Sequence, residues 1–250
     1  MPRASLASPP SPVHTRRAIA NCGLLAAEDK ASLLVVILDT NPFAWSALHD
    51  QLPLKTALSH ILLFLNAHLS FSHANQVAVI ASHTKTASFL YPNPAAAARA
   101  SASATTDPYR DANKYRLFGQ IEDTVQASLR ELLAGTDETT LHGTSETMMA
   151  GALSMALAYI HRAVGAGDKP DAPTSMTARI LVVSVSGDLA TQYVAVMNSI
   201  FAAQRNRVPV DICKIAGDTV FLQQASDSTG GIYMQLKHPE ALLQSLLVRF

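Results

Sequence analysis

The chain has 250 residues, 48% of them apolar and 15% charged, and its formal net charge is zero. This length and apolar content are sufficient for one domain with a sizeable core. Because the sequence has no excess of basic residues and no apolar run long enough to cross a membrane, we expect neither nucleic-acid binding nor membrane association.

Residues 1–13 are rich in Pro, Ser and Ala and show no periodicity, which is typical of a disordered tail. We expect residues 14–30 to carry a short helix that packs on the domain. Residues 33–38 form an unbroken apolar run with three β-branched side chains, which predicts a strand buried on both faces of a mostly parallel sheet. The run ends at Asp39. Because ligands bind at the carboxyl end of the first strand in such sheets, Asp39 marks the expected functional crevice.

The later elements are predicted from two patterns, apolar residues at helical spacing and short β-branched runs. We expect a helix from about Pro53 to Leu69, then a hairpin of strands 76–82 and 86–91, and then two helices at about 117–133 and 144–160. Strands are expected after these at 179–185, 208–215 and 231–236. Helices are expected between and after these strands, at 193–201, at 219–225 and from Pro239 to the end of the chain. Residues 92–111 are of low complexity and residues 163–177 are rich in Gly, Pro and Asp, so both are expected to be flexible insertions.

The alternation of strands with single helices indicates right-handed crossovers. The hairpin at 76–91 places one antiparallel strand at an edge of the sheet. The predicted fold class is therefore α/β: a doubly wound, mostly parallel six-stranded sheet with one antiparallel edge strand and helices on both faces.

Several long stretches of the sequence resemble a known family. They are residues 33–45, 76–82 with 89–92, 179–213 with the core Met197–Gln204, and 221–233. On these stretches the chain resembles the von Willebrand factor A domain, which has a Rossmann-like fold, and within it the smaller A-domain subunits of the general transcription and DNA repair factor TFIIH. The stretches cover nearly all of residues 14–250 apart from the two insertions, so we expect one von Willebrand factor A-like domain there.

The resemblance also implies a region that this sequence lacks. Members of that subunit family continue into a cysteine-rich zinc-binding region, whereas this chain has only Cys22 and Cys213 and ends at Phe250. We therefore expect a truncated form or an isolated domain. Zinc is implied only for the absent region, and no cofactor is expected in this domain.

The resemblance raises the question of a cation site. A domains with a working site use an Asp-x-Ser-x-Ser motif after the first strand, a Thr before the third helix and an Asp after the fourth strand. Here these positions carry Asp39, Asn41 and Phe43, then Thr144, then Ser186. Magnesium-like ions need several hard oxygen ligands, and this set offers too few. We expect a degenerate site without metal, in which Asp39 bonds to backbone amides; the alternative is a working divalent-cation site that mediates metal-dependent ligand binding.

No enzyme motif is present: the sequence has no phosphate-binding or dinucleotide-binding glycine loop, no HExxH motif and no nucleophile elbow. Ser184 and Ser186 fall at a predicted strand end, but no histidine or acid is predicted beside them. Cys213 falls within a predicted strand and is expected to be a buried apolar side chain. We therefore expect no enzyme activity and no catalytic residue.

The residues that follow the first strand suggest a binding surface instead. Pro42, Phe43 and Trp45, the single tryptophan, occupy this loop, and large aromatic residues are typical interface anchors. The alternative is that Phe43 and Trp45 pack beneath the first helix. The resemblance implies a non-catalytic scaffold of the TFIIH core that binds the larger, RING-bearing A-domain subunit and other core subunits. It also implies a role in RNA polymerase II transcription initiation and nucleotide excision repair, in the nucleus.

Overall fold

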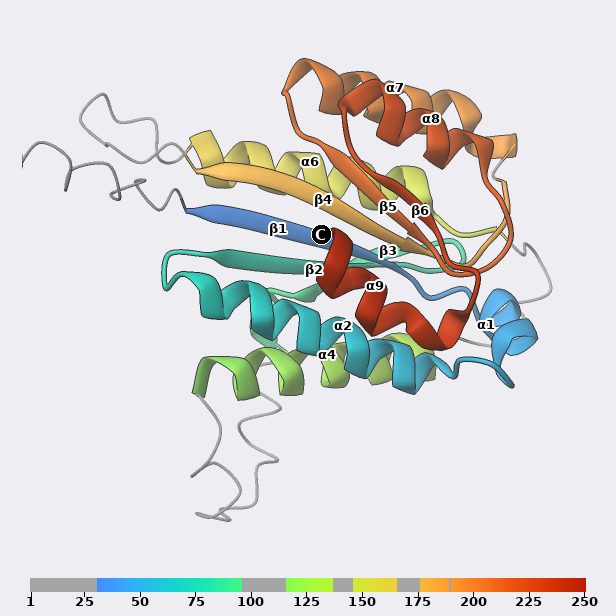
Figure 1. Cartoon of the computed structure of the whole chain (residues 1–250), viewed down its shortest axis with the longest axis horizontal. Coiled ribbons are helices and arrows are strands. Elements are labelled where there is room, and N and C mark those ends of the chain that lie inside the picture. Colours follow the sequence, from blue (N-terminus) through green and yellow to red (C-terminus); the bar gives the residue numbers. More distant parts are fainter. Residues whose placement is uncertain (1–30, 96–115, 137–145, 166–175, 189) are drawn as a thin grey trace, which may run out of the picture. The chain divides into compact units, whose positions relative to one another are not determined.

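Six strands form one sheet within the residues that the computed structural model describes, which are 31–95, 116–136, 146–165, 176–188 and 190–250. The sheet has the order β3-β2-β1-β4-β5-β6 (Figure 1). The strands are β1 (Ser32–Asp39), β2 (Gln76–Ser82), β3 (Ala87–Tyr91), β4 (Thr177–Ser184), β5 (Val210–Lys214) and β6 (Tyr233–Gln235). All neighbours pair in parallel except β3, which runs antiparallel to β2 at one edge. This arrangement confirms the predicted α/β fold.

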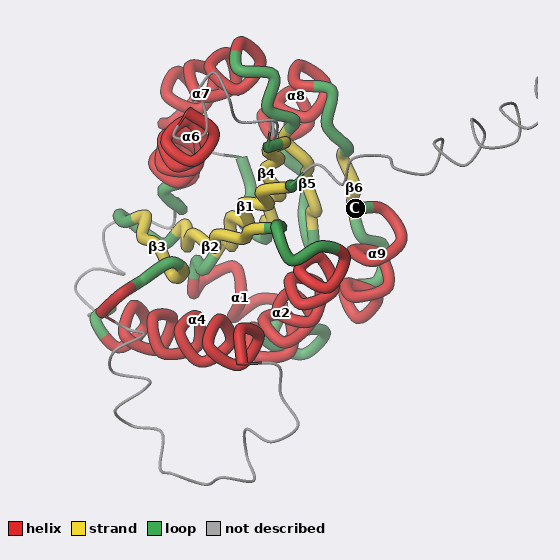
Figure 2. The backbone as a smooth tube through the Cα atoms, turned by 90° about the vertical axis from the view of Figure 1, so that its left-hand side faces the viewer, coloured by secondary structure: helices red, strands yellow, loops and turns green. Residues whose placement is uncertain are grey.

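Helices cover both faces of the sheet, as Figure 2 shows along the strands. The helices of one face are α1 (Pro42–Leu48), α2 (Leu54–Phe71), α4 (Arg116–Ala134) and α9 (Leu242–Arg249), and those of the other are α6 (Met149–Gly165), α7 (Tyr193–Arg205) and α8 (Val220–Thr229). Short 3₁₀ turns at Ala190–Gln192 and Pro239–Ala241 precede α7 and α9. None of the described helices is both long and apolar enough to span a membrane.

The first strand divides its side chains between two cores, because successive side chains of a strand point to opposite faces. Leu34, Val36 and Leu38 pack with α2 and α4, whereas Leu33, Val35 and Ile37 pack with α6 and α7. All six are at most 3% exposed. The unbroken apolar run in the sequence is therefore explained by a strand covered on both faces.

Several predicted bounds differ from the structure, and two of the differences lie near the expected crevice. Residues 42–48, predicted as a loop, form helix α1, because Asn41 caps it by accepting a hydrogen bond from the Phe43 N–H at 3.1 Å and Pro42 occupies its first turn. The helix predicted from about Thr144 begins at Met149. The preceding backbone is held by the hairpin instead, since Thr147 pairs with Thr84 and the Met148 N–H donates to the carbonyl of His83.

Some predicted segments fall outside the described residues. They are the tail at 1–13, the short helix within 14–30, most of the insertion at 92–111, and Thr144. For the insertion at 163–177, helix α6 extends to Gly165 and strand β4 begins at Thr177, so both of its ends belong to regular elements. The residues between them, 166–175, are again outside the described part of the chain.

Cys213 lies in the central part of the sheet, on β5, and is fully buried. Burial raises the pKa of its thiol to about 12, so the reactive thiolate is absent near pH 8. We expect that, in a Cys22→Ser variant, 5,5′-dithiobis(2-nitrobenzoate) leaves the native protein unmodified and titrates one thiol after denaturation in guanidinium. Modification of the native protein at the rate of a free thiol would contradict the buried placement.

Candidate functional site

β1 and β4 are neighbouring central strands, and their carboxyl ends lie at the same end of the sheet, next to α1 (Figure 1). The chain leaves β1 toward α1 and α2 on one face, and it leaves β4 toward α7 on the other. Such a reversal of direction opens a crevice between the two strands, which is where doubly wound proteins bind ligands. Asp39 and Ser186 come together here although 147 positions separate them in the sequence.

The Asp39 carboxylate is fully buried and holds three backbone amides. One oxygen accepts the Asn41 N–H at 3.1 Å, and the other accepts the N–H groups of Val185 at 3.1 Å and Ser186 at 2.8 Å. A buried carboxylate is stabilised by such hydrogen bonds. Asp39 therefore connects the loop after β1 to the loop after β4.

Ser186 is the residue that we expected in place of the A-domain aspartate, and all three of its polar groups are bound. Its N–H donates to Asp39, its hydroxyl oxygen accepts from the Asn41 side-chain amide at 3.0 Å, and its carbonyl accepts from the ammonium of Lys214. The Lys214 ammonium also donates to the Ser184 hydroxyl at 3.1 Å. Hydrogen bonds among residues at the ends of β1, β4 and β5 therefore occupy the polar groups inside the crevice.

Lys214 was not among the residues that the sequence pointed to. Its side chain is 0% exposed at the end of β5. Burial lowers the pKa of Lys214 to about 8, and the negative charges of Asp39, Asp188 and Asp218 act in the opposite direction, so the ammonium form predominates at neutral pH. The signal in the sequence was a charged residue at the end of a buried apolar strand, because lysine is almost never fully buried unless it is paired.

The residues present do not fit a divalent cation. Both oxygens of Asp39 accept backbone N–H groups, and the Asn41 side-chain oxygen accepts the Phe43 N–H. Phe43 offers no ligand, and Thr144 is outside the described residues; Thr147 lies nearby, but its hydroxyl donates to the Ser82 carbonyl. In the described ranges, no group of three or more His, Cys, Asp or Glu side chains could hold a metal. The buried ammonium of Lys214, whose charge interacts with that of Asp39, further disfavours a metal cation there.

The three residues proposed for partner binding have different environments. Trp45 is 5% exposed, packs in the core and donates its indole N–H to the Asp39 carbonyl at 2.7 Å. Pro42 is half-buried and Phe43 is 44% exposed. Phe43 lies at a shallow hollow of about 410 Å³ whose lining comes from α1 and the loops after β4 and β5, including Ala44, Ala47, Gly187 and Ala216. Of the three, Phe43 is the side chain that a partner can reach.

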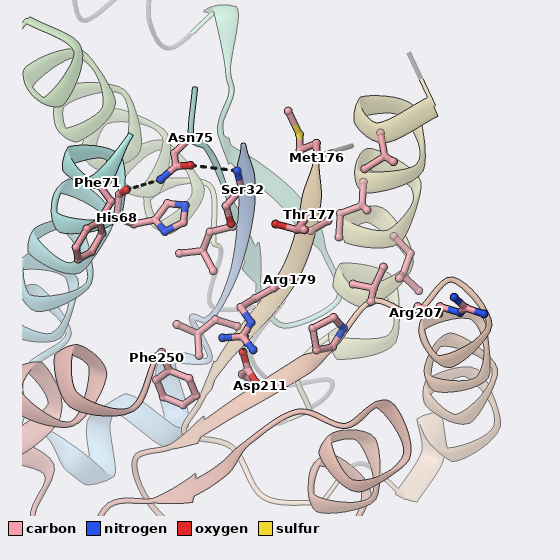
Figure 3. Close-up of a pocket in the computed structure, with 18 of the residues that line it drawn as sticks. Ser32, His68, Phe71, Asn75, Met176, Thr177, Arg179, Arg207, Asp211 and Phe250 are labelled. Atoms are coloured by element: carbon pink, nitrogen blue, oxygen red, sulfur yellow. Dashed lines mark hydrogen bonds and ion pairs between the residues drawn. The ribbon is translucent and has the colours of Figure 1, made fainter. Parts of the chain in front are cut away.

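A larger cavity of about 1260 Å³ lies at the opposite end of the strands, near the amino ends of β1 and β4 (Figure 3). Some of its polar groups bind one another. Arg179 pairs with Asp211 at 3.0 Å, and the Asn75 side chain accepts the Ser32 N–H at 3.0 Å and donates to the His68 carbonyl at 2.9 Å (Figure 3). The ion pair joins β4 to β5, and the Asn75 side chain joins the start of β1 to α2. None of the residues predicted from the sequence as functional lines this cavity.

Comparison with known proteins gives similarities along most of the chain. The family model of transcription factor Tfb4 matches residues 31–250. The general transcription and DNA repair factor IIH subunit tfb4 of Schizosaccharomyces pombe is 43% identical over 222 residues, which are 89% of this chain and 70% of that protein. The crystal structure of the TFIIH p34 N-terminal domain matches with a TM-score of 0.76 and 41% identity, over 89% of this chain and 99% of that one. A von Willebrand factor type A protein from Catenulispora acidiphila is similar in fold alone, with a TM-score of 0.55 and 15% identity over 87% of this chain and 41% of that one.

Proposed function

The chain belongs to the Tfb4 family of subunits of the general transcription and DNA repair factor IIH, and we propose that it serves there as a non-catalytic, protein-binding scaffold. Its proposed partner is the RING-bearing A-domain subunit of the same complex, with further contacts to other core subunits. In this role it acts in RNA polymerase II transcription initiation and nucleotide excision repair, in the nucleus.

The main support for this proposal is that the polar groups inside the crevice are bonded to other groups of the protein. In an enzyme or a cation-binding A domain, polar groups of the crevice must be available to a substrate or a metal. Here the carboxylate of Asp39, the three polar groups of Ser186 and the ammonium of Lys214 are bonded to one another or to backbone. The chemistry of the crevice is therefore used to hold the two loops in place.

The hollow at the surface of the crevice is lined mainly by apolar side chains. The hollow beside Phe43 is lined by Ala44, Ala47, Leu48 and Ala216 in addition to backbone of the loop after β4. A shallow apolar hollow suits a side chain of a protein partner, because interface cores are depleted of charge and enriched in aromatic and aliphatic groups. Since a stable interface buries roughly 1,000 Å² or more, this hollow would be one anchoring point in a larger contact.

Filling the hollow tests the partner contact. Ala47 is exposed and lines the hollow, so Ala47→Arg would place a long charged side chain there without altering the core. After co-expression with the RING-bearing subunit, we expect binding to weaken at least about tenfold, roughly 1.4 kcal/mol, measured by size-exclusion chromatography and calorimetry. The matched control is Ala134→Arg, at an exposed position of α4 outside the hollow, which should bind like the wild type.

Two results would contradict the proposal. Equal binding by both arginine variants would show that this hollow is not part of the interface. Micromolar binding of magnesium or manganese, abolished by Asp39→Ala, would instead support metal-dependent ligand binding at the crevice.

A further inference from the structure

Lys214 carries a charge that is completely removed from water. Burying an ammonium costs several kcal/mol unless hydrogen bonds and opposite charges compensate it. Its compensation here comes from the Ser184 hydroxyl, the Ser186 carbonyl and the negative charges of Asp39, Asp188 and Asp218. These groups supply the opposite charge and the hydrogen-bond acceptors that a buried ammonium requires.

The Lys214 ammonium and the Asp39 carboxylate both bind the backbone of Ser186. Asp39 accepts the N–H of Ser186, and Lys214 donates to the C=O of Ser186. The backbone dipoles of Ser186 therefore run between a negative and a positive group, which is electrostatically favourable in a buried setting. Because Asp39 is on β1 and Lys214 is on β5, this arrangement ties the loop after β4 to both of its neighbouring strands.

We propose that the Lys214 ammonium is a built-in replacement for the divalent cation of the von Willebrand factor A crevice, supplying positive charge opposite Asp39 and fixing the loop formed by Val185, Ser186 and Gly187. The surface of this loop lines the hollow beside Phe43, so Lys214 keeps that surface in shape without a metal. The inference does not depend on which protein binds there.

Chemical rescue of a truncated lysine provides the test. Lys214→Ala removes the side chain beyond Cβ and leaves a space with the dimensions of n-propylamine. In the full chain we expect Lys214→Ala to have a lower Tm than the wild type, and about 50 mM n-propylammonium to raise that Tm by roughly 3 °C, because a ligand that binds only the folded state stabilises it. Sodium chloride at equal ionic strength and the uncharged isostere 1-propanol should give no such rise.

Lys214→Met is the matched control, since it fills the space with an uncharged side chain of similar length. Neither amine nor alcohol should raise its Tm. The proposal is overturned if n-propylammonium raises the Tm of Lys214→Ala no more than that of Lys214→Met, or if 1-propanol rescues equally well, because the requirement would then be for volume and not for charge.

The wild-type chain supplies a second test that does not depend on how the variants fold. At neutral pH, ¹H–¹⁵N NMR should show a slowly exchanging ammonium signal that is missing from Lys214→Met, because a buried hydrogen-bonded ammonium is protected from water. Magnesium chloride and EDTA should leave the wild-type Tm unchanged. A neutral Lys214 amine in the NMR spectrum, or a Tm that rises with magnesium, would refute the replacement.

Discussion

Replacement of Asp39 with alanine is expected to lower the free energy of unfolding by about 4 kcal/mol, because it leaves three buried backbone N–H groups without an acceptor and the Lys214 ammonium without its main counter-charge. Typical domains are stable by only about 5–15 kcal/mol, so this loss is a large part of the total. Urea unfolding followed by circular dichroism and by the fluorescence of Trp45, the single tryptophan, measures the change.

Asp39→Asn separates the charge of this side chain from its shape. The amide keeps one oxygen acceptor but loses the second, and it brings an N–H₂ group toward backbone donors. We expect an intermediate loss of about 2–3 kcal/mol. If Asp39→Asn were as stable as the wild type, neither the charge nor the second oxygen would matter, and the interpretation of Asp39 as the connection between the two loops would be wrong.

Replacement of Trp45 with alanine is expected to cost about 3–5 kcal/mol, the usual range for removing a large buried aromatic side chain. Trp45 is 5% exposed and packs in the core formed with α2 and α4. Its indole N–H also satisfies the carbonyl of Asp39, so Trp45→Phe, which keeps most of the packing, should cost about 1–2 kcal/mol. Urea unfolding followed by circular dichroism compares the variants.

Phe43→Ala is the control that distinguishes packing from partner contact. Phe43 belongs to the same short helix but is 44% exposed at the hollow, so we expect a stability loss below about 1 kcal/mol together with weaker binding to the RING-bearing subunit. The opposite result, a stable Trp45→Ala chain that no longer assembles, would identify Trp45 as an interface residue.

The fold was largely predictable because its inner strands, β1, β2, β4 and β5, are mostly buried. An apolar run such as residues 33–38 fits only a covered, parallel strand, and the helical spacing of the later segments supplies the cover. The start of α6 was predicted wrongly because it depends on contacts outside the local pattern. The helix expected from Thr144 starts at Met149 because Thr147 and Met148 bond to the hairpin residues Thr84 and His83. No periodicity in residues 144–160 contains that information.

The sequence pointed to Asp39, Asn41 and Ser186 in the candidate site, but not to Lys214 and not to the hydrogen-bond partners of these residues. The sequence predicted a degenerate metal site, because Asn41 could offer only a neutral amide oxygen and the side chain of Phe43 offers no ligand. Helix α1, which was predicted as a loop, also has a local signal in the sequence: Asn41 caps the helix and Pro42 opens it. The exposure of Phe43 and the burial of Trp45 follow from how this helix packs, and two aromatic residues in one short segment cannot be assigned to surface and core from composition.

The sequence by itself determined the strand that carries Asp39, the doubly wound sheet and the family to which the chain belongs, because apolar patterns and side-chain identities are local properties of the chain. Only the tertiary structure decided that Asp39, Ser186 and Lys214 form one closed network. The three residues lie at the ends of β1, β4 and β5, and the parallel register of those strands brings Asp39 to Ser186 across 147 positions and Ser186 to Lys214 across 28. A buried ammonium is stable only where fixed carbonyl, hydroxyl and carboxylate oxygens surround it, and that condition depends on geometry in three dimensions.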